Sequence, residues 1–288
     1  MDIDLSLFVS LVASGIARGM IYFLLSCGLT IIFGVLGVVN FAHGAFYMVA
    51  FYLTCSMADA VGFWPSLILV PAAMAIIGAV AEMGLFRRIY KAGHVLQLLL
   101  SVGVIHIISD LVRIAWGLDP RNGVMPALFT GSIDLFGIGM SKYNLFIIGI
   151  SAVIAGVLIV MLYKTKLGSI IRACVFDEEM TRGVGINVSR VFLLVFMGGI
   201  ALAAIAAVIA FPITSGSLGM DAQMIIIAFC VSIIGGVGSI GGALISALII
   251  GVVESLGILI LPTYADSFIY LIVVAVLFIR PQGLFSLE

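Results

Sequence analysis

The sequence predicts an all-α protein that crosses a membrane several times, and three observations support this prediction. Of the 288 residues, 64% are hydrophobic and only 9% are charged, whereas soluble domains are about 25% charged. The mean hydropathy is +1.36. Because a transmembrane helix needs roughly 20 apolar residues, the chain has room for about eight to ten spans. This composition excludes a soluble enzyme, a disordered protein, a collagen and a disulfide-stapled secreted domain. The net charge of −1 offers no basic surface to nucleic acid.

Apolar stretches recur along the whole chain and predict about eight or nine transmembrane helices. The clearest is residues 143–163, which carry no charge between two tyrosines of the kind found at membrane interfaces. The others are expected at residues 5–27, 41–57, 64–86, 95–116, 191–211, 224–240, 243–261 and 268–279. Residues 28–39 are apolar but glycine-rich, which predicts a broken or re-entrant continuation of the first span. The acidic start, MDIDLSLFVS, lacks the positive region of a cleaved signal peptide, so the first apolar stretch is expected to stay as a span.

Most of the 13 basic residues follow spans that end on the same side. Arg87, Arg88 and Lys91 follow the third span, and Arg280 follows the last. The loop after the fifth span adds Lys164, Lys166, Arg172, Arg182 and Arg190. Cytoplasmic loops are enriched in Lys and Arg, so we expect this side in the cytoplasm, with the N-terminus outside and the C-terminus inside. The polar loops at residues 117–142 and 164–190 are too short to bury a core, so residues 1–288 are expected to form one transmembrane domain.

The inner loop, residues 164–190, contains a short charged helix with its own start and stop signals. Asp177 is a good N-cap, and Glu178 and Glu179 occupy the first turn, where the helix dipole favours negative charge. Arg182 lies near the other end, and Gly185 suits the left-handed position that follows a last turn. A helix this short is marginal in water unless it packs against something. Two interpretations stand: a solvated connector on the membrane surface, or a docking helix for a cytoplasmic partner.

Two glycine-interrupted apolar segments lie in matching places of the two halves of the chain. Residues 33–45 read FGVLGVVNFAHGA and residues 233–243 read IIGGVGSIGGA, a weak similarity that predicts a two-fold internal repeat. The second also matches the dinucleotide fingerprint G-x-G-x-x-G, but its flanks are apolar spans rather than a strand and a βαβ unit. Close packing of helices and broken helices lining a transport pathway are the alternatives. The candidate pathway residues are Gly34, Gly37, Asn40, His43, Gly44, Gly236, Gly238 and Gly241.

Polar groups at membrane depth are costly, so each ionisable one is a candidate functional site. Asn40 and His43 lie in the first interrupted segment, where they could donate to a solute or cap the ends of a broken helix. The sequence favours neither alternative. His106, Asp110 and Arg113 share one helix face by their spacing, and this pattern favours mutual pairing within that helix.

Three further charged groups lie in or beside predicted spans. Glu82 is one turn from Arg87 and Arg88, which predicts an ion pair near the membrane interface. Glu254 and Arg18 have no local partner, and they could pair with each other or with another chain. Each of these residues has a structural explanation as well as a functional one.

The sequence holds no arrangement typical of a catalytic or metal site. It contains no nucleophile–base pair, no HExxH, no clustered His, Cys and Asp, and no GxxxxGK[ST] phosphate loop. The four cysteines, at positions 27, 55, 174 and 230, are scattered and predict ordinary packing. We therefore expect a chain that is not an enzyme and carries no cofactor. If ATP drives transport, another polypeptide must hydrolyse it.

The motifs, taken together, resemble a known family. Residues 28–52, GLTIIFGVLGVVNFAHGAFYMVAFY, strongly resemble the first-half signature of the permease subunits of branched-chain amino acid ABC importers. Residues 233–254 resemble the family's second glycine segment, and residues 280–285, RPQGLF, resemble its usual ending. The chain looks like the shorter, H-type permease subunit. The loop of residues 168–191 is similar to the family's coupling segment, with these residues in matching places: Arg172, Ala173, Asp177, Gly185 and Ile186.

This resemblance implies a set of partners and a mechanism. The chain would pair with a second permease subunit as a heterodimer in the bacterial cytoplasmic (inner) membrane. Two ATP-binding subunits would hold ATP and magnesium, and a periplasmic or extracellular solute-binding protein would deliver branched-chain or related amino acids. Closure of the ATPase dimer would switch the pathway between outward and inward access. The residues expected to couple to the ATPase are Arg172, Asp177, Glu178, Glu179, Arg182 and Gly185.

One departure from the family and one rival class bear on this expectation. Many relatives carry an acid after the His-Gly of the first segment, where this chain has Ala45, so the solute is open among amino acids, urea or amides, and aromatic acids. The rival is a secondary transporter or channel driven by an ion gradient, with Glu254, His43 or Asp110 as the coupling site. A non-transporting scaffold is a third alternative, which the interrupted helices argue against.

Overall fold

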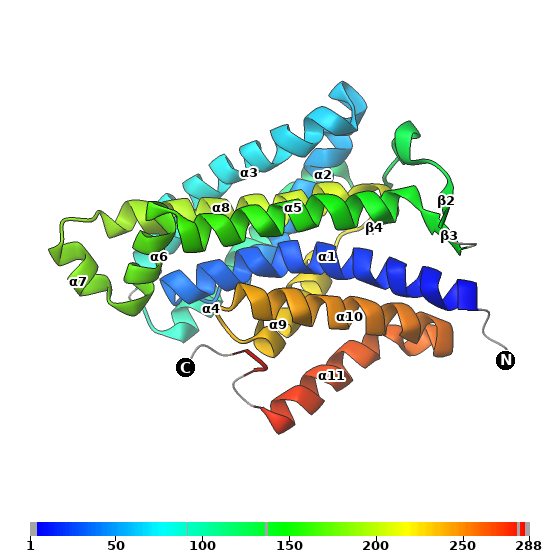
Figure 1. Ribbon diagram of the computed structural model, residues 1–288. Helices are drawn as coiled ribbons and strands as arrows, with labels where there is room; N and C mark the ends of the chain where they lie inside the picture. The colour runs from blue at the N-terminus through cyan, green and yellow to red at the C-terminus, as the bar shows by residue number, and fades with distance from the viewer. Residues whose placement is uncertain (1–4, 91, 136–137, 281–282, 286–288) are drawn as a thin grey trace.

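The structure is a computed structural model that describes residues 5–90, 92–135, 138–280 and 283–285. Nine long helices run between the two ends of the molecule (Figure 1). They are α1 (Leu5–Leu36), α2 (His43–Val61), α3 (Phe63–Gly84), α4 (His94–Trp116), α5 (Lys142–Lys164), α8 (Val188–Ala210), α9 (Met220–Gly235), α10 (Ile240–Ile260) and α11 (Ala265–Ile279). Seven are long and apolar enough to cross a membrane, and α9 and α11 are shorter apolar helices. The predicted all-α membrane fold is confirmed for the described residues.

Shorter elements connect the long helices. Helices α6 (Lys166–Phe176) and α7 (Glu178–Gly183) follow α5. The 3₁₀ turns are η1 (Phe86–Ile89), η2 (Ala127–Phe129), η3 (Phe211–Ile213) and η4 (Pro262–Tyr264). Two small antiparallel ribbons, which hydropathy did not predict, pair β1 (Arg121–Asn122) with β4 (Ser215–Gly216) and β2 (Ser132–Leu135) with β3 (Ile138–Ser141).

Helix α1 is the centre of the bundle, in contact with α5, α8, α9 and α10. Glycines allow these close approaches. A methyl group added at Gly28 would lie 2.4 Å from the carbonyl oxygen of Gly199 on α8, and one added at Gly19 would lie 2.7 Å from the carbonyl oxygen of Ala247 on α10. Small residues at such contacts let helix backbones pack closely in a membrane.

The two predicted interruptions exist, and both are shorter than the sequence suggested. The prediction of a broken helix across residues 28–39 was wrong for its first part, because α1 continues unbroken to Leu36. Gly28 and Gly34 lie inside this helix as packing positions, and the break is confined to residues 37–42. The second break, at residues 236–239, ends α9 earlier than the predicted boundary at residue 240.

The charged elements gather at one end of the bundle. Helices α6 and α7 lie at the opposite end of the molecule from the first turns of α1 and the β2–β3 ribbon (Figure 1). A cavity of about 270 Å³ at the α7 end is lined by Arg87 and Arg88 of η1 together with Glu178 and Arg182 of α7. The basic residues after the third and fifth spans therefore share one end, as predicted from charge. Lys91 lies outside the described residues.

The isolated charges in and beside the spans find partners within the chain. Arg18 pairs with Glu254 at 2.8 Å, and the Tyr22 hydroxyl donates to the same carboxylate at 2.7 Å. Arg113 pairs with Asp110 at 3.0 Å on the exposed side of α4. His106 is exposed beside this pair, and no described residue bonds to it.

The predicted pair at the membrane interface is also present. Glu82 is fully buried, and Arg87 donates to its two oxygens at 3.0 and 2.6 Å. The Tyr90 hydroxyl adds a third hydrogen bond at 2.8 Å. Burial, with a smaller contribution from this bond, raises the pKa of Tyr90, so the hydroxyl stays protonated and donates across the usual pH range.

Candidate functional site

The two interrupted segments and the helices beside them meet along the C-terminal half of α1, on its side facing α9. The hydroxyls of Thr30 on α1 and Ser232 on α9 are 2.8 Å apart. A methyl group added at Gly34 would lie 3.1 Å from the Cα of Gly238. The rings of Phe41 and Phe229 stack with centroids 4.8 Å apart. Residues about 200 positions apart in sequence thus form one surface, as expected where two repeats contact each other.

The first interruption is held by its own polar side chains. Gly37 adopts φ +64, a left-handed conformation that ends α1. The Asn40 side-chain oxygen accepts from the amide of Ala42 at 3.1 Å, which stabilises the turn into α2. His43 donates from Nε2 to the carbonyl oxygen of Leu25 at 3.1 Å and so attaches the start of α2 to the middle of α1.

Asn40 thus supports the turn and His43 joins two helices, and each keeps one unused polar atom. Both residues are fully buried. Asn40 Nδ2 and His43 Nδ1 have no hydrogen-bond partner among the described residues. Gly44 is required by packing, because a methyl group there would lie 2.2 Å from the carbonyl oxygen of Asp221.

The second interruption is a tight turn between two helices. Gly236 and Gly238 adopt φ +88 and +83, conformations that side chains other than glycine rarely tolerate. The Ser239 hydroxyl then accepts from the amide of Gly242 at 3.1 Å and caps α10. A helix, not a strand, precedes the glycines, so the geometry of a dinucleotide site is absent from this segment. Gly241 faces open space and lines none of the cavities described below.

Three cavities lie near this surface, and we call the second and third of them, which adjoin each other, the central groove. The first, of about 150 Å³, is lined by Phe41, Ala45, Ile105, Asp221, Ala222, Ile225 and Ile226. The second, of about 200 Å³, lies between Thr30, Phe33 and the Phe229–Ser232 turn of α9. The third, of about 590 Å³, includes Gly34, Gly238, Tyr163 and Arg172. The last two share Thr30, Phe33 and Val237 and so form one groove, which reaches α6. The first cavity shares no lining residue with them.

Arg172 closes the third cavity from α6. Its guanidinium lies 5.6 Å from the centre of the Tyr163 ring, a cation–π contact, and it donates to the carbonyl oxygen of Leu162. This places Arg172 between α5 and α6 at the mouth of the groove. The sequence assigned it to ATPase coupling, and in the structure it lies on α6, the helix that precedes and contacts α7.

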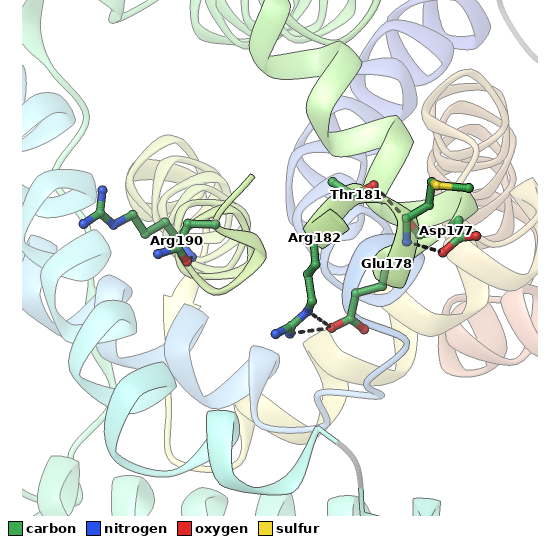
Figure 2. Close-up of polar contacts among 7 residues, drawn as sticks. Asp177, Glu178, Thr181, Arg182 and Arg190 are labelled. Carbon is green, nitrogen blue, oxygen red and sulfur yellow. Dashed lines mark hydrogen bonds and ion pairs between the residues drawn. The ribbon is translucent and has the colours of Figure 1, made fainter. Parts of the chain in front are cut away.

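Helix α7 forms as its signals predicted. Asp177 accepts from the amide of Met180 at 2.8 Å and caps the helix, and Arg182 donates to Glu178 at 2.6 Å (Figure 2). Gly185 follows the last turn with φ +87, and its amide donates to the carbonyl oxygen of Arg182 at 2.9 Å. Figure 2 shows the Arg190 side chain, at the start of α8, pointing away from the Arg182–Glu178 pair.

Apolar side chains are exposed on α7 and on the residues just before and after it. Phe176 is 94% exposed, and Met180 and Val184 are also exposed. In the same segment Cys174 is buried, and this burial, with a contribution from the charge of Glu178, raises the pKa of its thiol. Large exposed apolar groups beside charged ones are typical of a protein contact surface.

Sequence reasoning missed several residues around these cavities. Thr30, Ser232 and Phe229 lie inside apolar spans and carry no signal until the two segments are brought together. Asp221 was missed because the predicted span began at residue 224, which left the acid in an outer loop. The left-handed Gly219, at φ +98, starts α9 four residues earlier than the predicted boundary and buries Asp221.

Comparison with known proteins identifies the family. A family model described as the permease component of branched-chain amino acid transport systems matches residues 11–277. The chain belongs to this permease family. It is 30% identical to the high-affinity branched-chain amino acid transport permease LivH of Salmonella typhimurium strain LT2, over 96% of this chain and 95% of that protein. The permease BraD of Pseudomonas aeruginosa is 27% identical over the same shares.

A more distant relative extends the same result. The probable branched-chain amino acid permease LivH of Methanocaldococcus jannaschii is 28% identical over 92% of this chain and 88% of its own length. No solved structure matches this permease chain. The match along nearly the full length confirms the resemblance that the glycine segments predicted.

Proposed function

We propose that the chain is a permease subunit of an ATP-binding-cassette importer for branched-chain or related amino acids. A second permease subunit would complete the pathway along the central groove, and a solute-binding protein would deliver the solute from outside. ATP and magnesium would bind to separate ATPase subunits. The observation that best supports this proposal is α7, a capped and charged helix at the end of a permease bundle that presents Met180 beside the exposed Phe176, the last residue of α6.

The geometry around α7 suits a coupling element. Its cap and its Arg182–Glu178 pair keep the helix formed although it has only six residues. It contacts α6 on one side and α8 on the other. A displacement of α7 by an ATPase would therefore pass to α6, which carries Arg172 at the mouth of the groove, and to α8, which packs against α1.

The groove suits passage rather than tight binding. Its walls combine glycines, aliphatic side chains and aromatic rings, and Arg172 is the one charged residue that the described lining contains, so the groove lacks the pair of opposite charges that would trap a zwitterion. Discontinuous helices at this depth expose backbone groups to a solute while neighbouring helices satisfy the rest. High-affinity recognition then belongs to the binding protein.

The rival mechanism, coupling to an ion gradient, has less support. Glu254 is engaged by Arg18 and Tyr22, and Asp110 is paired with Arg113 on the exposed side of α4. A coupling-ion site needs a group that is free to exchange its partner along the pathway. Neither of these acids lines the groove.

Reconstituted vesicles test the proposal. With the second permease, the ATPase subunits and the binding protein present, uptake of labelled L-leucine should require ATP and persist when an ionophore removes ion gradients. Uptake by this chain alone, driven by a gradient and indifferent to ATP, would overturn the proposal. Screening the binding protein by thermal shift against amino acids, amides and aromatic acids identifies the solute.

A coupling variant tests the role of α7. Replacing Asp177, Glu178 and Glu179 together by alanine removes the cap and the acids of the first turn, which costs the helix about 1–2 kcal/mol. We expect ATP hydrolysis that no longer responds to the loaded binding protein, and uptake reduced at least fivefold. The matched control is Asp119→Ala, which removes an acid at the opposite end of the bundle. Normal coupling in the triple variant would refute the assignment.

A further inference from the structure

Helix α4 turns a polar face away from the rest of the chain. Residues spaced three or four apart share this face, which we call the α4 polar face: Gly103, His106, Asp110 and Arg113. All four are exposed, and the main contacts of α4 within the chain are with α2 and η1. The opposite side of the helix carries its buried residues, which are Gln97, Ser101, Val104 and Val112. No described part of the chain therefore covers the α4 polar face.

The ionisable groups of this face lie at membrane depth. Helix α4 has 23 residues and is about 35 Å long, slightly more than the roughly 30 Å of the hydrocarbon core of a bilayer. His106 lies near the middle of the helix, and Asp110 lies roughly 9 Å inside its outer end at Trp116. Ionisable groups at such depth almost always face protein or a water-filled cavity, because lipid tails offer them no hydrogen bonds.

The polar groups of the face satisfy one another only in part. Asp110 and Arg113 form one contact of 3.0 Å, and their side chains remain 61% and 56% exposed. A guanidinium has several N–H donors and a carboxylate accepts on both oxygens, so much of this bonding capacity stays open. No described residue bonds to His106. The buried acids Glu82 and Glu254, by contrast, each bond to an arginine and a tyrosine within the chain.

Helices α3 and α5 show how a surface suited to lipid is built in the same chain. The exposed side chains along the middle of these two helices are apolar, among them Ile68, Ile76, Val80, Val153, Val157 and Val160. Such side chains need no hydrogen-bond partner in a bilayer. The α4 polar face departs from this pattern, so its composition favours contact with protein over contact with lipid.

We propose that the second permease subunit packs on the α4 polar face, and that a membrane-spanning helix of that subunit presents hydrogen-bonding side chains to His106, Asp110 and Arg113. This inference rests on the proposed function, which supplies the second subunit. Gly103 permits a close approach, because a methyl group there would meet no atom within 4 Å and small residues let membrane helices pack closely. Ile105, beside His106, lines the first cavity together with α9, so α4 adjoins the helix that borders the central groove.

A steric variant tests the surface without removing a polar group. Gly103→Leu places a large side chain where this chain leaves open space, so the fold of the chain itself should be unaffected. Co-elution of the second permease subunit with the tagged variant in mild detergent should fall at least fivefold. The matched control is Gly156→Leu on α5, which also enters open space and lies about as far from the inner end of its helix. Equal co-elution of the two variants would overturn the inference.

A variant without the charges separates a protein contact from a lipid contact. The double variant Asp110→Leu, Arg113→Leu should lower co-elution at least fivefold, because the polar groups of the second subunit lose their partners. On a surface that meets lipid, the same change would leave co-elution unaltered or raise the yield of the inserted chain, and either result would overturn the inference. Both side chains are exposed, so the variant chain purified alone should stay monodisperse.

Cross-linking identifies the neighbour of the α4 polar face directly. In a chain carrying His106→Cys, with its four native cysteines replaced by alanine, benzophenone maleimide is attached to the new thiol. Illumination of membranes that contain the complete importer should give an adduct with the second permease subunit. The control, Val157→Cys on the exposed side of α5, should give little of it.

The remaining outcomes of the cross-linking experiment count against the inference. Adducts from position 106 with lipid alone, or with another copy of this chain, would overturn it. A wild-type chain that co-elutes with no second permease subunit would refute the proposed function together with the inference. An intact wild-type complex that gives no adduct between position 106 and the second subunit would refute only the assignment of the α4 polar face.

Discussion

The cluster around Glu82 gives a prediction whose size follows from the structure. Its carboxylate is 0% exposed and depends on Arg87 for two hydrogen bonds and on Tyr90 for one. The substitution Arg87→Met keeps the length and apolar stem of the side chain and removes the charge. Glu82 then stays buried with only the tyrosine as a donor.

The expected loss is about 2–3 kcal/mol. Removing one partner of a buried pair typically costs about 3–5 kcal/mol. The Arg87 side chain is 37% exposed, so water screens part of the interaction, and the remaining bond from Tyr90 offsets another part. For a chain of this size, that loss lowers the midpoint of thermal unfolding by about 4–8 °C.

The assay is thermal unfolding of the detergent-solubilised permease, followed by the fraction that stays monodisperse after heating. Arg88→Met is the matched control, because it removes the same charge one residue later, from an exposed side chain. Adding Glu82→Gln to Arg87→Met should recover most of the loss, since a neutral amide needs no cation. Equal midpoints for Arg87→Met and Arg88→Met, or no recovery in the double variant, would refute the reasoning.

Two further predictions concern packing and thiol chemistry. Gly28→Ala should destabilise the protein by about 1–3 kcal/mol, because the new methyl group would collide with Gly199. The control Gly149→Ala places its methyl group in open space and should be neutral or stabilising. Similar unfolding midpoints for the two variants would contradict this account of the α1–α8 contact. Alkylation by N-ethylmaleimide at pH 7.4 should be at least tenfold slower at Cys174 than at a cysteine introduced by Phe176→Cys. Burial limits access to the Cys174 thiol, and it also raises the pKa of that thiol and so lowers its thiolate fraction. Mass spectrometry measures both rates, and the Cys174 rate should increase as the pH is raised.

The sequence predicted the existence of the long helices well because the membrane sets their length and composition. The fourth span, expected at residues 95–116, is α4, His94–Trp116, since polar groups bound it on both sides. The boundaries of α1 and α9 were predicted less well. Backbone conformation at Gly37 and Gly236 decides where these helices end, and hydropathy does not register a positive φ.

The candidate site was predicted in part for a related reason. The two glycine segments do contact each other, with Gly34 and Gly238 at the contact, and Asn40 and His43 hold the first of the two breaks. The sequence could not decide which residue pairs with Arg18, because Glu254 is 236 positions away and only the packing of α1 on α10 brings the two together. Asp221 was missed because its burial depends on the path of residues 214–219, which carry no hydrophobic period.

Two of the three buried carboxylates among the described residues fix parts of the bundle to one another. Glu254 ties α10 to α1, where glycine contacts already hold the two helices together, and Glu82 ties α3 to the following turn. A buried pair resists any motion that would separate its members, because each charge would be left without compensation. Between α1 and α9, with the breaks that follow them, the described contacts are of another kind. They are the Gly34–Gly238 approach, the Phe41–Phe229 ring contact and the neutral Thr30–Ser232 hydrogen bond. Such contacts reform at small cost after separation, so the groove is the interface at which this bundle can open without breaking an ion pair.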